Sequence, residues 1–295
     1  MGYLNPASTA SPSDPLDLSS AELRDLVERA LAEDLGQGDL TTSVTVPPET
    51  LACGTFRSKQ TLVVAGLPVA AMVFQVLRPP AGWIPLVDDG TEVAPGAELA
   101  RACGPAATLL AGERVALNFV QHLSGVATYA RRLKEELAGT RAEFLDTRKT
   151  TPGLRSLQKY AVRLGGGQNH RLRLDDGILI KNNHLKLTGG IRAAVASAQR
   201  QRPAGFHIEV EVTDLAQLEE ALACGADGVL LDNMTPDQVR QCVERAAGRI
   251  RLEVSGGIDA SNIRDYAETG VDYISVGALT HSAPAVDINF RIEPA

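Results

Sequence analysis

The segment from residue 146 to residue 187 constrains this chain more than any other, because basic side chains alternate there with glycines and short apolar runs. Between Asp146 and Lys186 it holds nine Lys and Arg residues against three Asp residues, a local excess of six positive charges. The whole chain has a net charge of -7. A basic island in an acidic protein predicts a small polyanionic ligand, because nucleic-acid binding favours a broadly basic surface.

The alternative interpretation of this segment is that its charges form the solvated face of a basic helix. Against it, the charges are interrupted by glycines at 165–167, by hydroxyl and proline residues at 150–153, and by an apolar run at 177–180. The basic groups therefore fall where strands turn into loops, which favours a binding site.

Length and composition limit the fold. A chain of 295 residues is long enough for one large α/β barrel or for two domains. Hydrophobic residues make up 44% of the chain, but aromatic residues make up only 4% of it. The core must therefore be mostly aliphatic, as in parallel sheets covered by helices.

The termini and cysteines indicate a cytoplasmic protein. Residues 1–16 are rich in Ser, Pro and Ala and predict a disordered tail, with neither the basic nor the apolar region of a signal peptide. No window approaches 18 uninterrupted apolar residues, so we expect no membrane span. The four cysteines lack metal-ligand spacing and are interpreted as structural thiols in a reducing compartment.

Residues 17–125 predict an N-terminal α+β domain. A capping box at Ser19 and Glu22 begins a helix that ends at Gly36, and the acid- and glycine-rich residues 33–42 predict a loop. Residues 111–137 have helical spacing, with a break expected at Gly125. Strands are predicted at 54–56, 61–65, 83–87 and 97–103, with a helix at 69–77.

Residues 126–284 alternate strands with helices, which predicts parallel βαβ units. Only six strands are visible, so an incomplete (β/α) barrel fits better than a full one, and an open doubly wound sheet is the alternative. In both folds the active site lies at the carboxyl ends of the strands. The last run, 285–292, is expected to rejoin the N-terminal domain. The strands are predicted at 143–146, 177–180, 208–212, 228–231, 250–254 and 273–276.

Acids and glycines follow these strands. Strict alternation in 208–212 directs Glu209 and Glu211 to one face, where buried carboxylates need a cation or other partner. Asp232 ends the next strand, and its alternative role is to cap the helix that follows Thr235. Glycine loops at 255–257 and 277 predict a phosphate site, since backbone N–H groups can approach an anion there. The site therefore predicts a phosphorylated and a carboxylated substrate, with Mg²⁺ between the acids and a pyrophosphate.

The motifs also resemble a known family, the carboxylating nicotinate-nucleotide pyrophosphorylases or quinolinate phosphoribosyltransferases. The similarity covers about residues 18–292, and the long block 146–184 is its most specific part. The segments that carry it are EDLGQGDLTT (33–42), ERVALNFVQHLSGVAT (113–128), residues 146–184, IEVEV (208–212), LLDNM (230–234), EVSGGI (253–258) and residues 274–292.

The resemblance implies an N-terminal α/β sandwich domain, an incomplete α/β barrel, and a homodimer or a larger assembly of dimers such as a hexamer. It implies the joining of quinolinate to 5-phosphoribosyl 1-pyrophosphate with Mg²⁺, giving nicotinate mononucleotide, pyrophosphate and CO₂. The implied quinolinate ligands are Arg148, His170 and Arg171, with Arg114 from the partner subunit. Lys149, Lys181 and His184 would contact the phosphoribosyl donor or the reacting carboxylate. Glu211 and Asp232 would bind ribose hydroxyls and Mg²⁺, directly or indirectly, and Ser255, Gly256, Gly257 and Gly277 the 5-phosphate.

Three rival functions are weighed against this one. A paralogous phosphoribosyltransferase with another acceptor would not need a set of Arg148, His170 and Arg171 suited to two carboxylates. A Schiff-base barrel would use Lys149 or Lys181 and would have no need of Arg148. A non-catalytic nucleotide sensor would bind both ligands without consuming either.

Overall fold

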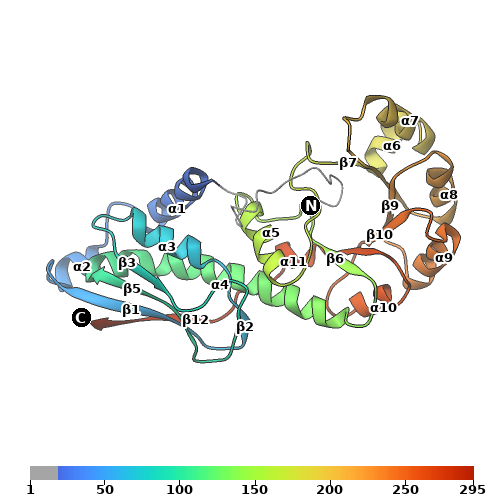
Figure 1. Cartoon of the computed structure of the whole chain (residues 1–295). Helices are drawn as coiled ribbons and strands as arrows, with labels where there is room; N and C mark the ends of the chain where they lie inside the picture. Colours follow the sequence, from blue (N-terminus) through green and yellow to red (C-terminus); the bar gives the residue numbers. More distant parts are fainter. Residues whose placement is uncertain (1–18) are drawn as a thin grey trace. The chain divides into compact units, whose positions relative to one another are not determined.

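The computed structural model describes residues 19–295, which fall into two compact units. The antiparallel unit comprises residues 19–129, 156–165 and 283–295, and the parallel unit comprises residues 130–155 and 166–282 (Figure 1). The predicted tail, 1–16, lies outside the described residues. Within residues 19–295 no helix has both the length and the apolar character needed to cross a membrane.

The antiparallel unit is built on a four-stranded sheet in the order β12-β1-β5-β3 (Figure 1). The final strand β12 pairs antiparallel with residues 52–58 of β1, so the last strand of the chain lies in the same sheet as the first. The strands of this unit are β1 (Leu51–Ser58), β3 (Gly82–Pro85), β5 (Glu98–Pro105) and β12 (Ile288–Pro294), with a separate β2 (Leu62–Val63) and β4 (Glu92–Val93) pair. Its helices are α1 (Ser20–Leu35), α2 (Leu40–Thr45), α3 (Leu67–Val76) and most of α4 (Ala106–Glu136), with α5 (Arg155–Leu164).

The parallel unit contains a six-stranded parallel sheet in the order β6-β11-β10-β9-β8-β7, whose edges are β6 and β7. Its strands are β6 (Glu143–Leu145), β7 (Ile178–Ile180), β8 (Ile208–Val212), β9 (Gly228–Asp232), β10 (Arg251–Ser255) and β11 (Tyr273–Ser275). Its helices are α6 (Asn182–Thr188), α7 (Ile191–Gln201), α8 (Leu215–Ala223), α9 (Pro236–Ala246), α10 (Ile263–Ala267) and α11 (Ala278–His281). The outer helices follow the curve of the sheet (Figure 1). The predicted fold class, an antiparallel sheet domain plus parallel α/β, is confirmed.

Local signals account for several boundaries. Ser19 and Glu22 form the predicted capping box, and Gly36 ends α1 with a positive φ of 51°. The prediction of a loop across residues 33–42 was wrong at both ends, because α1 continues to Leu35 and α2 begins at Leu40. Asp39 caps α2 by accepting a hydrogen bond from the Thr42 amide at 2.9 Å.

The expected helix break at Gly125 was also wrong, since α4 continues from Ala106 to Glu136. A Cβ on residue 125 would collide with the carbonyl oxygen of Pro284. Gly125 therefore serves a close backbone approach between α4 and the segment before β12, and not a break in the helix.

The interpretation of all four cysteines as free thiols was wrong for two of them. Cys53 of β1 lies opposite Cys103 of β5 in the antiparallel register, with their Cα atoms 4.1 Å apart, and the two form a disulfide. Cys224 and Cys242 are free thiols. This pairing could not be predicted from the sequence, because the two cysteines are 50 residues apart and only the register of β1 and β5 brings them together.

Thiol titration of the unreduced, denatured protein should therefore detect Cys224 and Cys242 only. Pretreatment with a reductant should double the count. Closing a loop of this length restricts the unfolded chain, so replacing Cys53 and Cys103 with Ser should lower the free energy of unfolding by up to about 4 kcal/mol. Four reactive thiols without reductant would contradict the pairing.

Candidate active site

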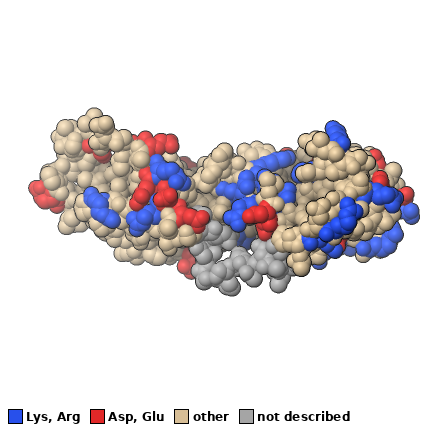
Figure 2. All heavy atoms as spheres, turned by 90° about the horizontal axis from the view of Figure 1, so that it is seen from above, with Lys and Arg blue, Asp and Glu red and all other residues tan. Residues whose placement is uncertain are grey.

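The predicted site residues of the parallel unit follow the carboxyl ends of its strands. Arg148 and Lys149 follow β6, Lys181 and His184 follow β7, and Glu211 lies in β8. Asp232 ends β9, Ser255 ends β10, and Gly277 follows β11. Because the six strands are parallel, all these positions lie at the same end of the sheet, where the strands have their carboxyl ends. Figure 2 shows Lys and Arg side chains gathered over this unit, and not spread evenly over the surface in view.

Asp146 anchors the loop that carries His170 and Arg171. Its carboxylate is fully buried, and it accepts hydrogen bonds from the His170 amide at 2.9 Å and from the Asn169 side chain. Next to it, Leu145 forms a parallel bridge with Gln168. The chain after α5 is thereby tied to the open edge of β6 before it continues to β7.

Further contacts hold the rest of this loop. Arg155 donates to the Leu172 carbonyl at 3.1 Å and to the Thr150 hydroxyl at 3.0 Å. The guanidinium of Arg171 donates to the Gly177 carbonyl at 2.7 Å. Arg155 belongs to the basic segment seen in the sequence. Because its guanidinium bonds to other residues of the protein, we assign it a structural role and no ligand contact.

Arg148 and Arg171 form an electropositive pair. Burial lowers the pKa of Arg171, and the positive charge of Arg148 lowers it further. The Nε atom of Arg148 is buried and has no hydrogen-bond partner in the described residues. Two mutually repelling guanidinium groups with an unsatisfied donor are the arrangement that a carboxylate ligand would stabilise.

Lys181 and Glu211 form an ion pair across neighbouring strand ends, with Nζ 3.2 Å from Oε2. The other oxygen of Glu211 accepts the Asn182 amide hydrogen at 3.1 Å. His184 turns back, so that its Nδ1 accepts from the Lys181 amide at 2.9 Å and caps α6. The short helix α6 thus fixes the direction of both Lys181 and His184.

Asp232 does not cap α9, because Thr235 occupies that position. One oxygen of Asp232 accepts from the Asn233 side chain at 2.8 Å, and the other accepts from the Ser255 hydroxyl at 3.2 Å. Asn233 has a positive φ of 55°, uncommon for a residue with a side chain. This conformation brings Asn233 against Gly256, where a Cβ would clash with it.

The two glycine loops differ in the reason for their glycines. Gly256 and Gly257 have positive φ values of 107° and 64°, which favour glycine. Gly277 has an ordinary helical φ of -65°, but a Cβ there would lie 3.1 Å from His281 Nε2 and 3.2 Å from Lys149 Cδ. Gly277 therefore makes room for two basic side chains. His281 was missed from the sequence, although its position one helical turn after Gly277 could have revealed it.

Glu253 was missed as well. His170, Glu209 and Glu253 are buried together, with His170 Nε2 3.5 Å from an oxygen of each glutamate. Burial, with the charge of Glu209 as the next cause, raises the pKa of Glu253 to about 8. Its inward direction could have been inferred from the alternation in 251–255, as it was for Glu209.

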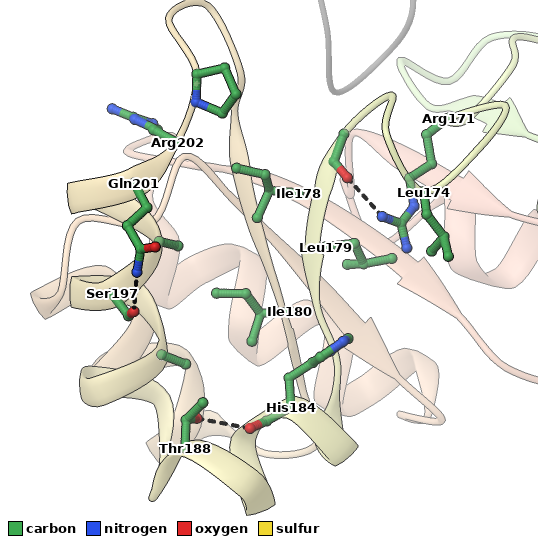
Figure 3. A pocket seen from close by; sticks show the side chains of 14 residues that line it. Arg171, Leu174, Ile178, Leu179, Ile180, His184, Thr188, Ser197, Gln201 and Arg202 are labelled. Atoms are coloured by element: carbon green, nitrogen blue, oxygen red, sulfur yellow. Dashed lines mark hydrogen bonds between the residues drawn. The ribbon is translucent and has the colours of Figure 1, made fainter.

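A pocket of about 470 Å³ lies on the other side of the edge strand (Figure 3). Ile178 and Ile180 of β7 point toward α6 and α7, whereas Arg171 lies across β7 from them (Figure 3). Its lining combines aliphatic residues with Arg171, His184 and Arg202, so two of the predicted site residues also border this pocket. Arg114 belongs to α4 in the antiparallel unit, where it is exposed.

Replacing Glu253 with Gln should flatten the dependence of stability on pH. The pKa of Glu253 is raised in the folded state from 4.5 to about 8, so the folded protein holds an extra proton between these values. Stability is then greatest below the lower value and declines as pH rises through the higher one. Since one pKa unit corresponds to about 1.4 kcal/mol, the loss is at most a few kcal/mol.

The measurement is urea unfolding of the wild type and the Gln variant from pH 5 to pH 8.5, with the exposed Glu219→Gln as control. The wild type should lose stability relative to Glu253→Gln as pH rises. Parallel curves for the two proteins would contradict the raised pKa.

Comparisons with known proteins identify the family of the chain. The domain family described as "Quinolinate phosphoribosyl transferase, C-terminal domain" matches residues 126–291, and the corresponding N-terminal domain family matches residues 39–124. The "Nicotinate-nucleotide pyrophosphorylase [carboxylating]" of Mycobacterium leprae is 44% identical over 275 residues, covering 91% of this chain and 96% of that protein. A probable enzyme of the same name from Bacillus subtilis is 41% identical, covering 93% of this chain and 95% of the relative.

Among solved structures, the nicotinate-nucleotide pyrophosphorylase from Francisella tularensis superposes with a TM-score of 0.90 at 37% sequence identity, covering 96% of this chain and all of that one. Both domain families, the full-length relatives and the fold agree. The chain therefore belongs to the quinolinate phosphoribosyltransferase family.

Proposed function

We propose that this chain is a carboxylating nicotinate-nucleotide pyrophosphorylase acting in NAD biosynthesis. It transfers the phosphoribosyl group of 5-phosphoribosyl 1-pyrophosphate to quinolinate, with loss of CO₂, to give nicotinate mononucleotide and pyrophosphate. The observation that carries the proposal is the Arg148 and Arg171 pair, whose mutual repulsion and buried unsatisfied Nε an anion would stabilise. A dicarboxylate acceptor supplies the two negative charges that match it.

In this proposal Arg148 and Arg171 bind the acceptor carboxylates through planar two-point contacts, which lysines do not reproduce. Arg114 is exposed on α4 and is supplied by the partner subunit. His170 has its Nε2 near two glutamates and its Nδ1 bonded to the Arg171 amide. Its contribution to acceptor binding is therefore made largely through Arg171.

The phosphoribosyl donor is assigned to the remaining strand ends. The loops at Ser255–Gly257 and Gly277 receive the 5-phosphate, and His281 and Lys149 flank Gly277. Lys149, Lys181 and His184 contact the donor or the reacting carboxylate, and Glu211 and Asp232 face the ribose. Glu211 and Asp232 also fit Mg²⁺, which takes one or two carboxylates together with substrate phosphates. When bound, Mg²⁺ offsets the charge of the leaving pyrophosphate.

The chemistry follows from these placements. As the bond from ribose C1 to pyrophosphate breaks, positive charge grows on C1 and is stabilised by the carboxylates of Glu211 and Asp232. The quinolinate nitrogen then bonds to C1 and becomes cationic. The carboxylate next to that nitrogen leaves as CO₂, and its electron pair stays on the ring carbon beside the cationic nitrogen. That carbon takes up a proton, for which Lys149 and Lys181 are the ammonium donors at these strand ends.

The proposed assembly is a homodimer, or a hexamer built from dimers. On α2, Leu40 and Val44 lie four residues apart and are each 81% exposed, so one face of this helix is apolar and open. In the parallel unit Leu187 is 86% exposed. Apolar side chains at this exposure support burial against a second copy, which would also shield the ribosyl centre from water.

A turnover assay tests the function. Purified protein with quinolinate, 5-phosphoribosyl 1-pyrophosphate and Mg²⁺ should release CO₂ and nicotinate mononucleotide in equal amounts, and nicotinate in a parallel tube should not be consumed. Removing Mg²⁺ with a chelator should abolish turnover. Binding of the phosphoribosyl donor without turnover of quinolinate would overturn the assigned acceptor.

Subunit mixing tests the role of Arg114. Arg114→Ala alone should lose nearly all activity while keeping its thermal stability, and so should Lys149→Ala. Mixed dimers of the two variants contain one complete site, so an equal mixture should recover about a quarter of wild-type activity after subunit exchange. Arg132→Ala, exposed on the same helix, is the matched control. No recovery on mixing would place Arg114 in its own subunit's site.

A further inference from the structure

Two fully buried glutamates lie behind the proposed acceptor site. Glu209 of β8 and Glu253 of β10 are both 0% exposed, and the strand between them, β9, carries Gly228 opposite Glu209. Replacing such acids with apolar residues is often neutral or stabilising in a protein core. Packing alone therefore does not explain why this sheet directs two acids inward.

Both glutamates meet the same partner. The Nε2 atom of His170 lies 3.5 Å from Oε2 of Glu209 and 3.5 Å from Oε2 of Glu253. On the other side of the ring, Nδ1 accepts a hydrogen bond from the Arg171 amide at 2.7 Å. An accepting Nδ1 carries no hydrogen, so the hydrogen of the ring is on Nε2 and faces the glutamates.

The His170 ring therefore links the glutamates to the backbone of Arg171. The guanidinium of Arg171 is held separately by the Gly177 carbonyl at 2.7 Å. The negative charge of Glu209 also acts directly on Arg171, raising its pKa against the larger lowering by burial and by Arg148. Movement of the His170 ring would therefore shift Arg171, the residue proposed to bind the acceptor.

We propose that Glu209 and Glu253 are positioning residues, which hold the His170 ring so that its Nδ1 fixes the Arg171 peptide and presents the Arg171 guanidinium to the acceptor. This inference rests on the proposed binding of the acceptor by Arg171. It assigns neither glutamate a contact with the substrate.

The first test is kinetic. Glu209→Leu and Glu253→Leu should each raise KM for quinolinate about tenfold or more, because the 3.5 Å contact that holds Nε2 of the His170 ring is lost. KM for the phosphoribosyl donor should stay unchanged, since its proposed ligands are elsewhere. Glu253→Gln keeps an acceptor for the ring and should restore KM for quinolinate to near the wild-type value. Glu219→Leu, on the outer helix α8, is the control.

The second test does not depend on activity. In ¹⁵N spectra of the histidine rings, with His170→Gln identifying the signal, His170 of the wild type should carry its hydrogen on Nε2. Glu253→Leu should shift this signal and Glu253→Gln should largely preserve it. A wild-type ring protonated on Nδ1 would overturn the inference, and so would a stoichiometric metal ion in the purified protein that is lost in Glu253→Leu, because the ring would then be a ligand.

Arg171→Ala distinguishes failure of the proposed acceptor site from failure of the positioning role. If Arg171→Ala raises KM for quinolinate but both Leu variants do not, the acceptor assignment stands and the positioning role is wrong. If Arg171→Ala also leaves KM unchanged, the proposed acceptor site itself fails. If the Leu variants do not fold, His170→Gln replaces them: removing the ring should raise KM for quinolinate, and an unchanged KM would overturn the inference.

Discussion

The candidate site depends on the buried carboxylate of Asp146. It lies at the end of β6, and it accepts the His170 amide hydrogen and the Asn169 side chain, more than twenty residues further along the chain. These donors help to satisfy a charge that would be strongly destabilising if it were buried without partners. The same carboxylate therefore joins the end of β6 to the loop that carries His170 and Arg171.

Neighbouring groups offset some of the charges at the strand ends, whereas one pair of cations repels. Lys181 is neutralised by Glu211, and Asp232 is satisfied by Asn233 and Ser255. Arg148 and Arg171 instead repel each other, and the described residues leave a buried donor of Arg148 unsatisfied. The cation pair is the part of the site that an anionic acceptor would stabilise most. Preorganised but unpaired donors are what recognition of a dicarboxylate requires.

Much of the fold, and the residues at the strand ends, could be predicted from local sequence patterns. Alternation of apolar runs with helical spacing predicted the strands from β6 to β11 and the longer helices between them, but not the short helix α6, because burial and periodicity are local properties. Residues at strand ends followed from the parallel arrangement. The helix at Leu40–Thr45 was missed because a single capping residue, Asp39, outweighed the glycines before it. Gly125 was misinterpreted because its neighbour in space, Pro284, is far away in sequence.

The sequence alone therefore determined the fold class and the family, since these depend on periodicity and on residue type in short motifs. Tertiary structure decided which groups meet. It paired Cys53 with Cys103 through strand register, placed His281 beside Lys149 at Gly277, and brought His170 between Glu209 and Glu253. Each of these contacts joins residues from different strands or turns, and their distances are fixed by sheet curvature and packing, which no local pattern encodes.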